Sequence, residues 1–177
     1  FSAIKNNDKV GVLFFSDKIE KFVPPKKGKN HILRIIRELI EFKPSNKKTD
    51  INIPLQFLSN ILKNRAIVFL ISDFISDDYS NSLRIISSKH DITGIRVYDK
   101  SEMTIPNLGL VQLLDNEDGK RKLVYTGSKK VRKKYKEYYL EKSKIFEENF
   151  KKAGAGIIEC ATEDSYQKKL LRYFRNR

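Results

Sequence analysis

Short apolar runs alternate with amphipathic stretches along this chain, a pattern typical of α/β domains. The apolar runs lie at 10–15 and 66–72, and a further strand is predicted at 92–98. An apolar run of strand length indicates a strand buried on both faces, as in a parallel sheet covered by helices. Between the runs, apolar residues at helical spacing predict helices at 32–40, 54–62 and 83–86. The alternation predicts a mostly parallel sheet joined by right-handed crossovers.

Two segments depart from this rhythm and predict antiparallel pairs. The alternating segment 19–23 follows a two-residue turn, and we expect an edge strand that stops at Pro24 and Pro25. The runs 110–114 and 122–125 flank a polar stretch that contains Gly119, which predicts an extra β-hairpin near 108–125.

The remaining segments are predicted to be mostly helical. Ser128 is expected to cap a long helix that reaches about Ala153, a short strand should follow at 156–160, and Thr162 should cap the last helix. The inward positions expected on these two helices are Val131, Tyr135, Tyr138, Ile145, Phe146 and Phe150, then Tyr166, Leu170, Tyr173 and Phe174. Residues 1–4 resemble the last turn of a helix already under way. We therefore expect a single domain over 1–177 that is an N-terminal truncation of a longer protein.

Composition narrows the class of protein. No apolar run is long enough for a transmembrane span, and the chain length suits one domain with its own core. Cys160 is the single cysteine, which excludes an internal disulfide and favours a reducing, cytoplasmic compartment. The 36 Lys and Arg against 22 Asp and Glu give a formal charge of +14, which favours acidic partners. The alternative is a lysine-rich surface that only keeps the protein in solution.

A carboxylate ends the apolar run at 66–72, because Asp73 follows it directly. Ligands of open α/β sheets gather at the carboxyl ends of strands, so Asp73 is a candidate site residue. Thr49 lies just ahead of the helix that feeds this strand. A Thr hydroxyl and an Asp carboxylate suit Mg²⁺, although two ligands alone would hold it poorly. The alternative is that Thr49 caps a helix and Asp73 begins a turn.

Other acidic and histidine residues give weaker signals. Residues 78–82 read D-x-S-x-S, a pattern of metal-binding loops, but they lie at a helix start, where Asp78 or Ser80 as a cap explains them better. A metal-dependent hydrolase could use Asp73, Asp77 and Asp78. No nucleophile–base pair accompanies these residues, and lone histidines such as His31 and His90 are usually structural. The sequence therefore favours a protein that is not an enzyme.

A basic run begins the long helix. Six of the eight residues at 129–136 are cationic: Lys129, Lys130, Arg132, Lys133, Lys134 and Lys136. Cations are disfavoured at a helix N-terminus, so the run indicates a surface for an acidic protein or a nucleic acid. The alternative is a solvated helix face.

The order of these segments resembles the family called domain of unknown function 58, whose members are von Willebrand factor A-like and are often encoded beside MoxR-type AAA+ ATPases. The segments that carry the resemblance are 8–11, 15–17, 24–28, 49–51, 72–74, 90–91, 99–102, 105–106, 115–119 and 162–166. The resemblance implies an α/β, Rossmann-like, mostly parallel sheet flanked by helices. It also implies a protein-interaction or adaptor domain, with a MoxR-type ATPase system as partner.

In von Willebrand A domains, the metal-ion-dependent adhesion site combines a D-x-S-x-S after the first strand, a Thr and an Asp. By this resemblance Thr49 and Asp73 take the second and third roles, and the first motif is missing with its central strand. We expect an incomplete site here, with Mg²⁺ or a similar cation only in the complete protein. The missing strand would lie between 10–15 and 66–72. Either it belongs to residues outside this chain, or the gap closes, or a second copy fills it as a homodimer.

Overall fold

The structure is a computed structural model that describes residues 2–46, 48–114 and 121–176, with side chains from residue 4 onward. Its elements, in chain order, are α1 (Ser2–Lys5), β1 (Val10–Phe15), β2 (Ile19–Lys26), α2 (Lys29–Glu41), α3 (Asn52–Ile61), β3 (Ile67–Ser72), α4 (Ser80–Ser87), β4 (Asp91–Tyr98), the 3-10 helix η1 (Lys100–Met103), β5 (Leu110–Leu114), β6 (Arg121–Tyr125), α5 (Lys129–Lys152), β7 (Gly156–Ala161) and α6 (Tyr166–Arg175). Every predicted helix and strand is present, and their order confirms an α/β domain.

Three separate sheets organise the described residues. β3, β4 and β7 form a parallel sheet in the order β3-β4-β7, while β1 pairs with β2 and β5 pairs with β6, both antiparallel. The predicted edge strand is longer than expected, because β2 continues through Pro24 and Pro25 to Lys26. A proline is tolerated there because β2 is an edge strand, with β1 as its one neighbour among the described strands.

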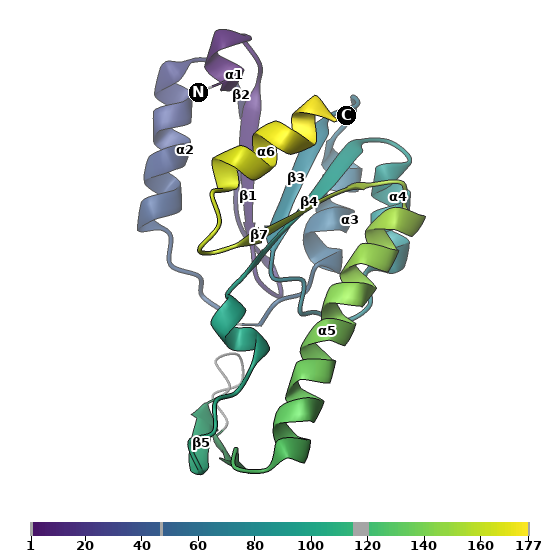
Figure 1. Ribbon diagram of the computed structural model, residues 1–177. Coiled ribbons are helices and arrows are strands. Elements are labelled where there is room, and N and C mark those ends of the chain that lie inside the picture. Colours follow the sequence, from purple (N-terminus) through teal and green to yellow (C-terminus); the bar gives the residue numbers. More distant parts are fainter. Residues whose placement is uncertain (1, 47, 115–120, 177) are drawn as a thin grey trace.

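The main core lies on one face of the parallel sheet, under α3, α4 and α5 (Figure 1). Fully buried side chains from all three helices meet there, among them Leu55, Leu83, Phe146 and Phe150. Gly94 of β4 allows this approach, since a Cβ at that position would lie 2.5 Å from the ring of Phe150. The long helix therefore packs its C-terminal half against the sheet.

Among the described helices, α6 is the one that packs on the opposite face of the sheet. Phe174 of α6 makes an edge contact with Phe69, yet Ile67, Phe69 and Ile71 of β3 remain exposed. The prediction that this strand is buried on both faces is therefore wrong. Only Leu70 of β3 is fully buried, because the main core covers one face and a single short helix covers the other incompletely.

β1 and β3 are not hydrogen-bonded neighbours. The β1–β2 pair reaches the rest of the domain through Phe15, which packs against the main core, and through α2, where the His31 ring nitrogen Nε2 lies 2.8 Å from the carbonyl oxygen of Val10. The gap expected from the absent central strand has therefore not closed by direct pairing. Whether a segment outside this chain or a second copy occupies it stays a prediction.

Helix positions show where the predicted stripes hold and where they fail. Tyr139, Phe146 and Phe150 are the buried residues of α5, whereas Tyr138 and Ile145 are exposed, so the expected stripe is wrong by one position at Tyr138. On α6, Leu170 and Tyr173 are partly buried and Tyr166 and Phe174 are more than half exposed. The hairpin is confirmed in its two strands, and its tip at 115–119 lies outside the described residues.

Candidate functional site

Three loops meet at the carboxyl ends of β1 and β3. The backbone N–H of Asp50 donates to the carbonyl oxygen of Ser16 over 3.1 Å, which ties the loop before α3 to the end of β1. The hydroxyl of Ser76, in the loop after β3, donates to the carbonyl of Thr49 and accepts from the N–H of Ile51, both over 3.4 Å. The segments that carry Thr49 and Asp73 therefore lie at the same edge of the fold.

Asp73 presents its carboxylate at the surface. One carboxylate oxygen accepts the backbone N–H of Ile75 over 3.1 Å, and Phe74 between them has a φ of 59°, so the chain turns sharply directly after the strand. This local hydrogen bond closes a turn that begins at Asp73, as the alternative interpretation of this residue predicts. It occupies one oxygen and leaves the exposed carboxylate facing solvent.

Thr49 is half-buried and does not cap α3, whose N-cap is Ile51. Asp50 serves the helix start instead, since its carboxylate accepts the N–H of Asn52 over 2.9 Å. The capping alternative for Thr49 is therefore wrong. Within the described residues, no group of three or more His, Cys, Asp or Glu side chains could hold a metal ion. A cation at Thr49 and Asp73 would depend on water and on groups from elsewhere.

The D-x-S-x-S segment belongs to the start of α4, as its position predicts. The carboxylate of Asp78 accepts the N–H of Ser80 over 2.9 Å, and this bond lowers the pKa of Asp78. Tyr79, not Asp78 or Ser80, occupies the N-cap position. Ser82 donates to the side-chain oxygen of Asn52 over 2.7 Å and so joins α4 to α3. These side chains are engaged within the fold rather than gathered around a site.

Arg96 of β4 is the residue at this edge that sequence reasoning missed. Its guanidinium donates to Glu159 over 3.0 Å and to Ser143 over 2.8 Å, and Nε donates to the carbonyl of Asp73 over 3.4 Å. The rings of Tyr98 and Tyr139 lie 5.0 and 5.2 Å from its central carbon. A charge inside an otherwise apolar strand was the signal that could have found it. Through its bond to the Asp73 carbonyl, Arg96 helps to position the loop that follows β3.

Two acidic residues lie beside this edge, Asp17 in the turn between β1 and β2 and Glu20 at the start of β2. Glu20 accepts hydrogen bonds from the hydroxyls of Ser45 (2.6 Å) and Ser16 (2.7 Å), and these bonds lower its pKa. Asp17 accepts from the side-chain amide of Asn46 over 2.7 Å. The loop before Thr49 is therefore anchored to the β1–β2 turn, which gives the edge a defined shape.

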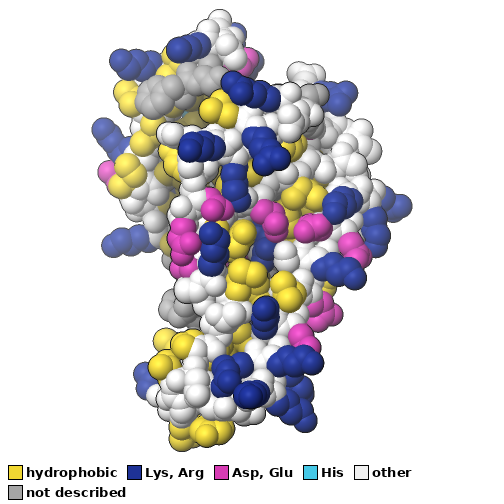
Figure 2. Space-filling view, in the orientation of Figure 1, with side chains coloured by type: hydrophobic (Ala, Val, Ile, Leu, Met, Phe, Trp, Pro, Cys, Tyr) yellow, Lys and Arg dark blue, Asp and Glu magenta, His cyan; other side chains and the backbone are white. Residues whose placement is uncertain are grey.

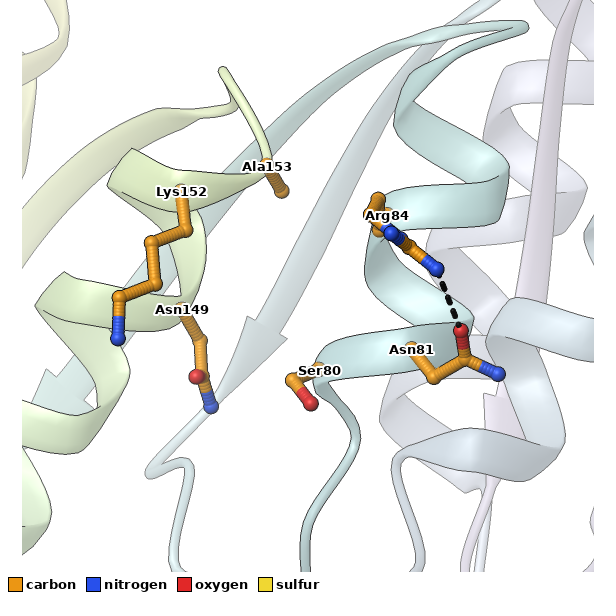
Figure 3. Close-up of a pocket in the computed structure, with 6 residues that line it drawn as sticks. All are labelled: Ser80, Asn81, Arg84, Asn149, Lys152 and Ala153. Atoms are coloured by element: carbon orange, nitrogen blue, oxygen red, sulfur yellow. Dashed lines mark hydrogen bonds between the residues drawn. The ribbon is translucent and has the colours of Figure 1, made fainter.

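A cavity of about 270 Å³ opens between the first turns of α4 and the last turns of α5 (Figure 3). Ser80, Asn81, Arg84, Asn149, Lys152 and Ala153 line it. The Arg84 guanidinium donates to Asn81 over 3.3 Å, and Lys152 lies across the cavity on the facing helix (Figure 3). Burial raises the pKa of the neighbouring Tyr79 to about 12. The cavity is small for a ligand site, and its two charged lining residues, Arg84 and Lys152, are both cationic, so it suits a small anion better than a cation.

The basic run of α5 is mostly solvent-facing. Lys129, Lys130, Lys133, Lys134 and Lys136 are exposed. Arg132 differs, because its guanidinium donates to the carbonyls of Thr126 (2.5 Å) and Gly127 (3.0 Å) and so fixes the helix to the preceding hairpin. Arg132 is therefore a structural residue, and the five lysines remain candidates for partner binding.

The two histidines lie away from Asp73. His31 meets the Val10 carbonyl, as described above. His90 is buried at the start of β4, the opposite end of the strands from Asp73, and burial lowers its pKa. Within the described residues, neither ring nitrogen of His90 has a hydrogen-bond partner. Neither histidine stands beside the acidic residues that a hydrolase would need.

Sequence comparison identifies similar proteins. The family model described as "Protein of unknown function DUF58" matches residues 1–145. Uncharacterized proteins Rv1480 of Mycobacterium tuberculosis and Mb1516 of Mycobacterium bovis are 25% identical over 115 residues, which cover 63% of this chain. That match spans only 36% of the length of these curated relatives.

Structural comparison identifies the fold. An aerotolerance-related membrane protein from Bacteroides fragilis, solved with multiple mutations to serine, is 15% identical with a TM-score of 0.56, over 97% of this chain and 81% of that one. BatB from Bacteroides thetaiotaomicron is 14% identical with the same TM-score, over 96% and 78%. The predicted von Willebrand A-like α/β fold is confirmed. None of the helices in the described part of this chain has the length and apolar character to cross a membrane.

Proposed function

The chain belongs to the DUF58 family, and from that premise we propose that it is a cytoplasmic, non-enzymatic domain that binds a protein partner at the edge around Asp73. The observation that carries the proposal is the hydrogen-bonded junction of three loops there, through Ser16, Thr49 and Ser76. A junction anchored on strands and helices holds exposed groups in a fixed geometry, which favours recognition because little order must be gained on binding.

A divalent cation is the proposed bridge to the partner. Mg²⁺ takes oxygen ligands and keeps several waters, so the hydroxyl of Thr49 and the carboxylate of Asp73 could hold it only with further ligands. A carboxylate from a partner would supply one of them. The bound cation would thereby make the contact selective for partners that present an acidic side chain.

A MoxR-type AAA+ ATPase is the proposed partner, on the strength of the family resemblance. The test is direct binding of this chain to a purified MoxR-type ATPase, measured by biolayer interferometry with Mg²⁺ and with a chelator. We expect the chelator to abolish binding, and Asp73→Asn or Thr49→Val to weaken it by about tenfold or more, a loss of about 1.4 kcal/mol. Asp77→Asn, an exposed carboxylate in the same loop, is the matched control and should leave affinity unchanged.

Two results would count against the proposal, and they separate its parts. Binding that resists the chelator and responds equally to the Asp73 and Asp77 variants would exclude the cation bridge while keeping the interaction. Absence of any binding to the ATPase would exclude the partner.

A further inference from the structure

We propose that this protein docks on the surface of an anionic phospholipid bilayer through an arm made of the β5–β6 hairpin and the first turns of α5, residues 108–114 and 121–140. The arm extends away from the parallel sheet, at the lower end of the molecule in Figure 1. In Figure 2, hydrophobic and basic side chains gather together at this end. The surface is distinct from the edge around Asp73.

One face of the hairpin is an exposed apolar surface. The strand register pairs Leu110 with Tyr125, and Leu114 with Arg121, while Leu123 pairs with Gln112 between them. Side chains two apart on a strand share a face, so these six lie together. The four apolar members are 56% to 67% exposed, and Leu108 just before the strand is 67% exposed. Neighbouring apolar side chains that are exposed to solvent form a patch, and such a patch marks an interaction surface.

Exposed lysines lie on the helix that follows this hairpin. Lys129, Lys130, Lys133, Lys134 and Lys136 are exposed on the adjoining helix. Lys133 makes an exposed ion pair with Glu137, and no ion pair links the other four to a described residue. Over the whole segment 108–140 the sequence has nine Lys and Arg against four Asp and Glu, a surplus of five positive charges. The lysines lie at the positive end of the helix dipole, where an anionic partner would stabilise them.

The hairpin and the helix are held as one unit. The hydroxyl of Thr126, fully buried, donates to the carbonyl of Gly109 over 2.8 Å and accepts the N–H of Leu108 over 2.9 Å. Arg132 closes the other side through the carbonyls of Thr126 and Gly127. The apolar face and the lysines are therefore already fixed relative to each other, and no folding step is needed before they bind a surface.

A bilayer fits this combination better than a nucleic acid does. Burial of aliphatic side chains at the boundary between headgroups and acyl chains strengthens binding to a bilayer. Electrostatic attraction between lysines and anionic headgroups strengthens it further. Single-stranded nucleic acids are bound by aromatic stacking platforms within basic grooves, whereas six of the eight large exposed apolar residues in the described arm are leucines. Charge complementarity and apolar area thus point to the same partner.

Co-sedimentation with lipid vesicles tests the proposal. The intact chain should bind vesicles of phosphatidylcholine mixed with phosphatidylserine, and should not bind phosphatidylcholine alone. Lys130→Gln, Lys133→Gln and Lys134→Gln combined should weaken binding by about 100-fold, at about fivefold per lysine. The matched control changes Lys144, Lys151 and Lys152 to Gln on the same helix, which are equally exposed and lie outside the arm. This control should retain binding.

Leucine variants test the apolar half. Leu110→Ser and Leu123→Ser should each weaken vesicle binding by about tenfold, while Leu171→Ser on α6, equally exposed, should have no effect. A polarity-sensitive dye on Leu123→Cys should shift to the blue on phosphatidylserine vesicles, which checks insertion independently. Failure to bind these vesicles would overturn the proposal, as would binding that ignores the leucine changes. Tighter, salt-sensitive binding to duplex DNA or RNA would assign the arm to nucleic acid instead.

Discussion

Breaking the ion pair between Arg96 and Glu159 should destabilise the domain unequally from its two sides. Arg96 is 4% exposed and Glu159 is 33% exposed. Glu159→Leu leaves a buried guanidinium whose remaining contacts in the described residues are Ser143, the Asp73 carbonyl and two tyrosine rings. Removing one partner of a buried ion pair lowers the free energy of unfolding by about 3–5 kcal/mol. We expect the lower end of this range because Glu159 is partly hydrated.

Arg96→Met should cost less, about 2 kcal/mol, because the partly exposed Glu159 can return to water. The loss then consists of charged hydrogen bonds and ring contacts, offset by the apolar replacement. The double variant should cost about 3 kcal/mol, since neither charge remains unpaired. The two changes should therefore be less than additive by about 2 kcal/mol.

Urea unfolding followed by far-UV circular dichroism gives these free energies. The control cycle uses Lys151 and Glu147, an exposed pair four residues apart on α5 whose coupling should not exceed about 0.5 kcal/mol. The reasoning is refuted if Glu159→Leu costs less than Arg96→Met, or if the two changes add to within about 0.5 kcal/mol.

Two further outcomes follow from the core. Gly94→Ala should lower the free energy of unfolding by about 1–3 kcal/mol, because the new Cβ would crowd Phe150 and Phe146; a thermal melt that matches the wild type would contradict this. Burial lowers the pKa of His90, so the unfolded chain binds the extra proton first and stability should fall as the pH drops below the ordinary value of 6.5. His90→Leu should flatten the stability profile between about pH 7 and pH 5, whereas His31→Leu should keep the slope; equal slopes in both variants would exclude His90 as the cause.

The apolar runs were sufficient to predict the strands, and helical spacing was sufficient to predict the helices. Exposure was harder to predict, as β3 illustrates. The run that contains Ile67, Phe69 and Ile71 looks like a doubly buried strand, yet only one of its faces is fully covered. A sequence pattern reports what a strand would bury, whereas burial depends on which helices arrive on each face.

The predicted start of the last helix is wrong for a related reason. Thr162 was predicted as a cap, but its N–H donates to the Tyr98 carbonyl over 2.9 Å, so it still belongs to the sheet edge. Ser165 is the N-cap instead, and the helix begins at Tyr166. At the site, hydrogen bonds from Ser76 join the loop after Asp73 to the segment of Thr49, and the pairing of these two residues as cation ligands stays a prediction. For Arg96 the one signal was its charge inside an otherwise apolar strand, because its long-range pair with Glu159 leaves no local pattern.

Helix α5 joins the two surfaces proposed for this protein. Its C-terminal half is fixed in the core by Phe146 and Phe150, and its N-terminal half carries the lysines of the arm. Between these halves, Tyr139 and Ser143 contact Arg96, which in turn holds the carbonyl of Asp73. The arm and the Asp73 edge are therefore set at a fixed distance by one continuous helix of 24 residues. Because the arm follows β4 through η1, it leaves the fold at the strand ends where Asp73 lies, so a bilayer bound to the arm would lie on the side that this edge faces (Figure 1).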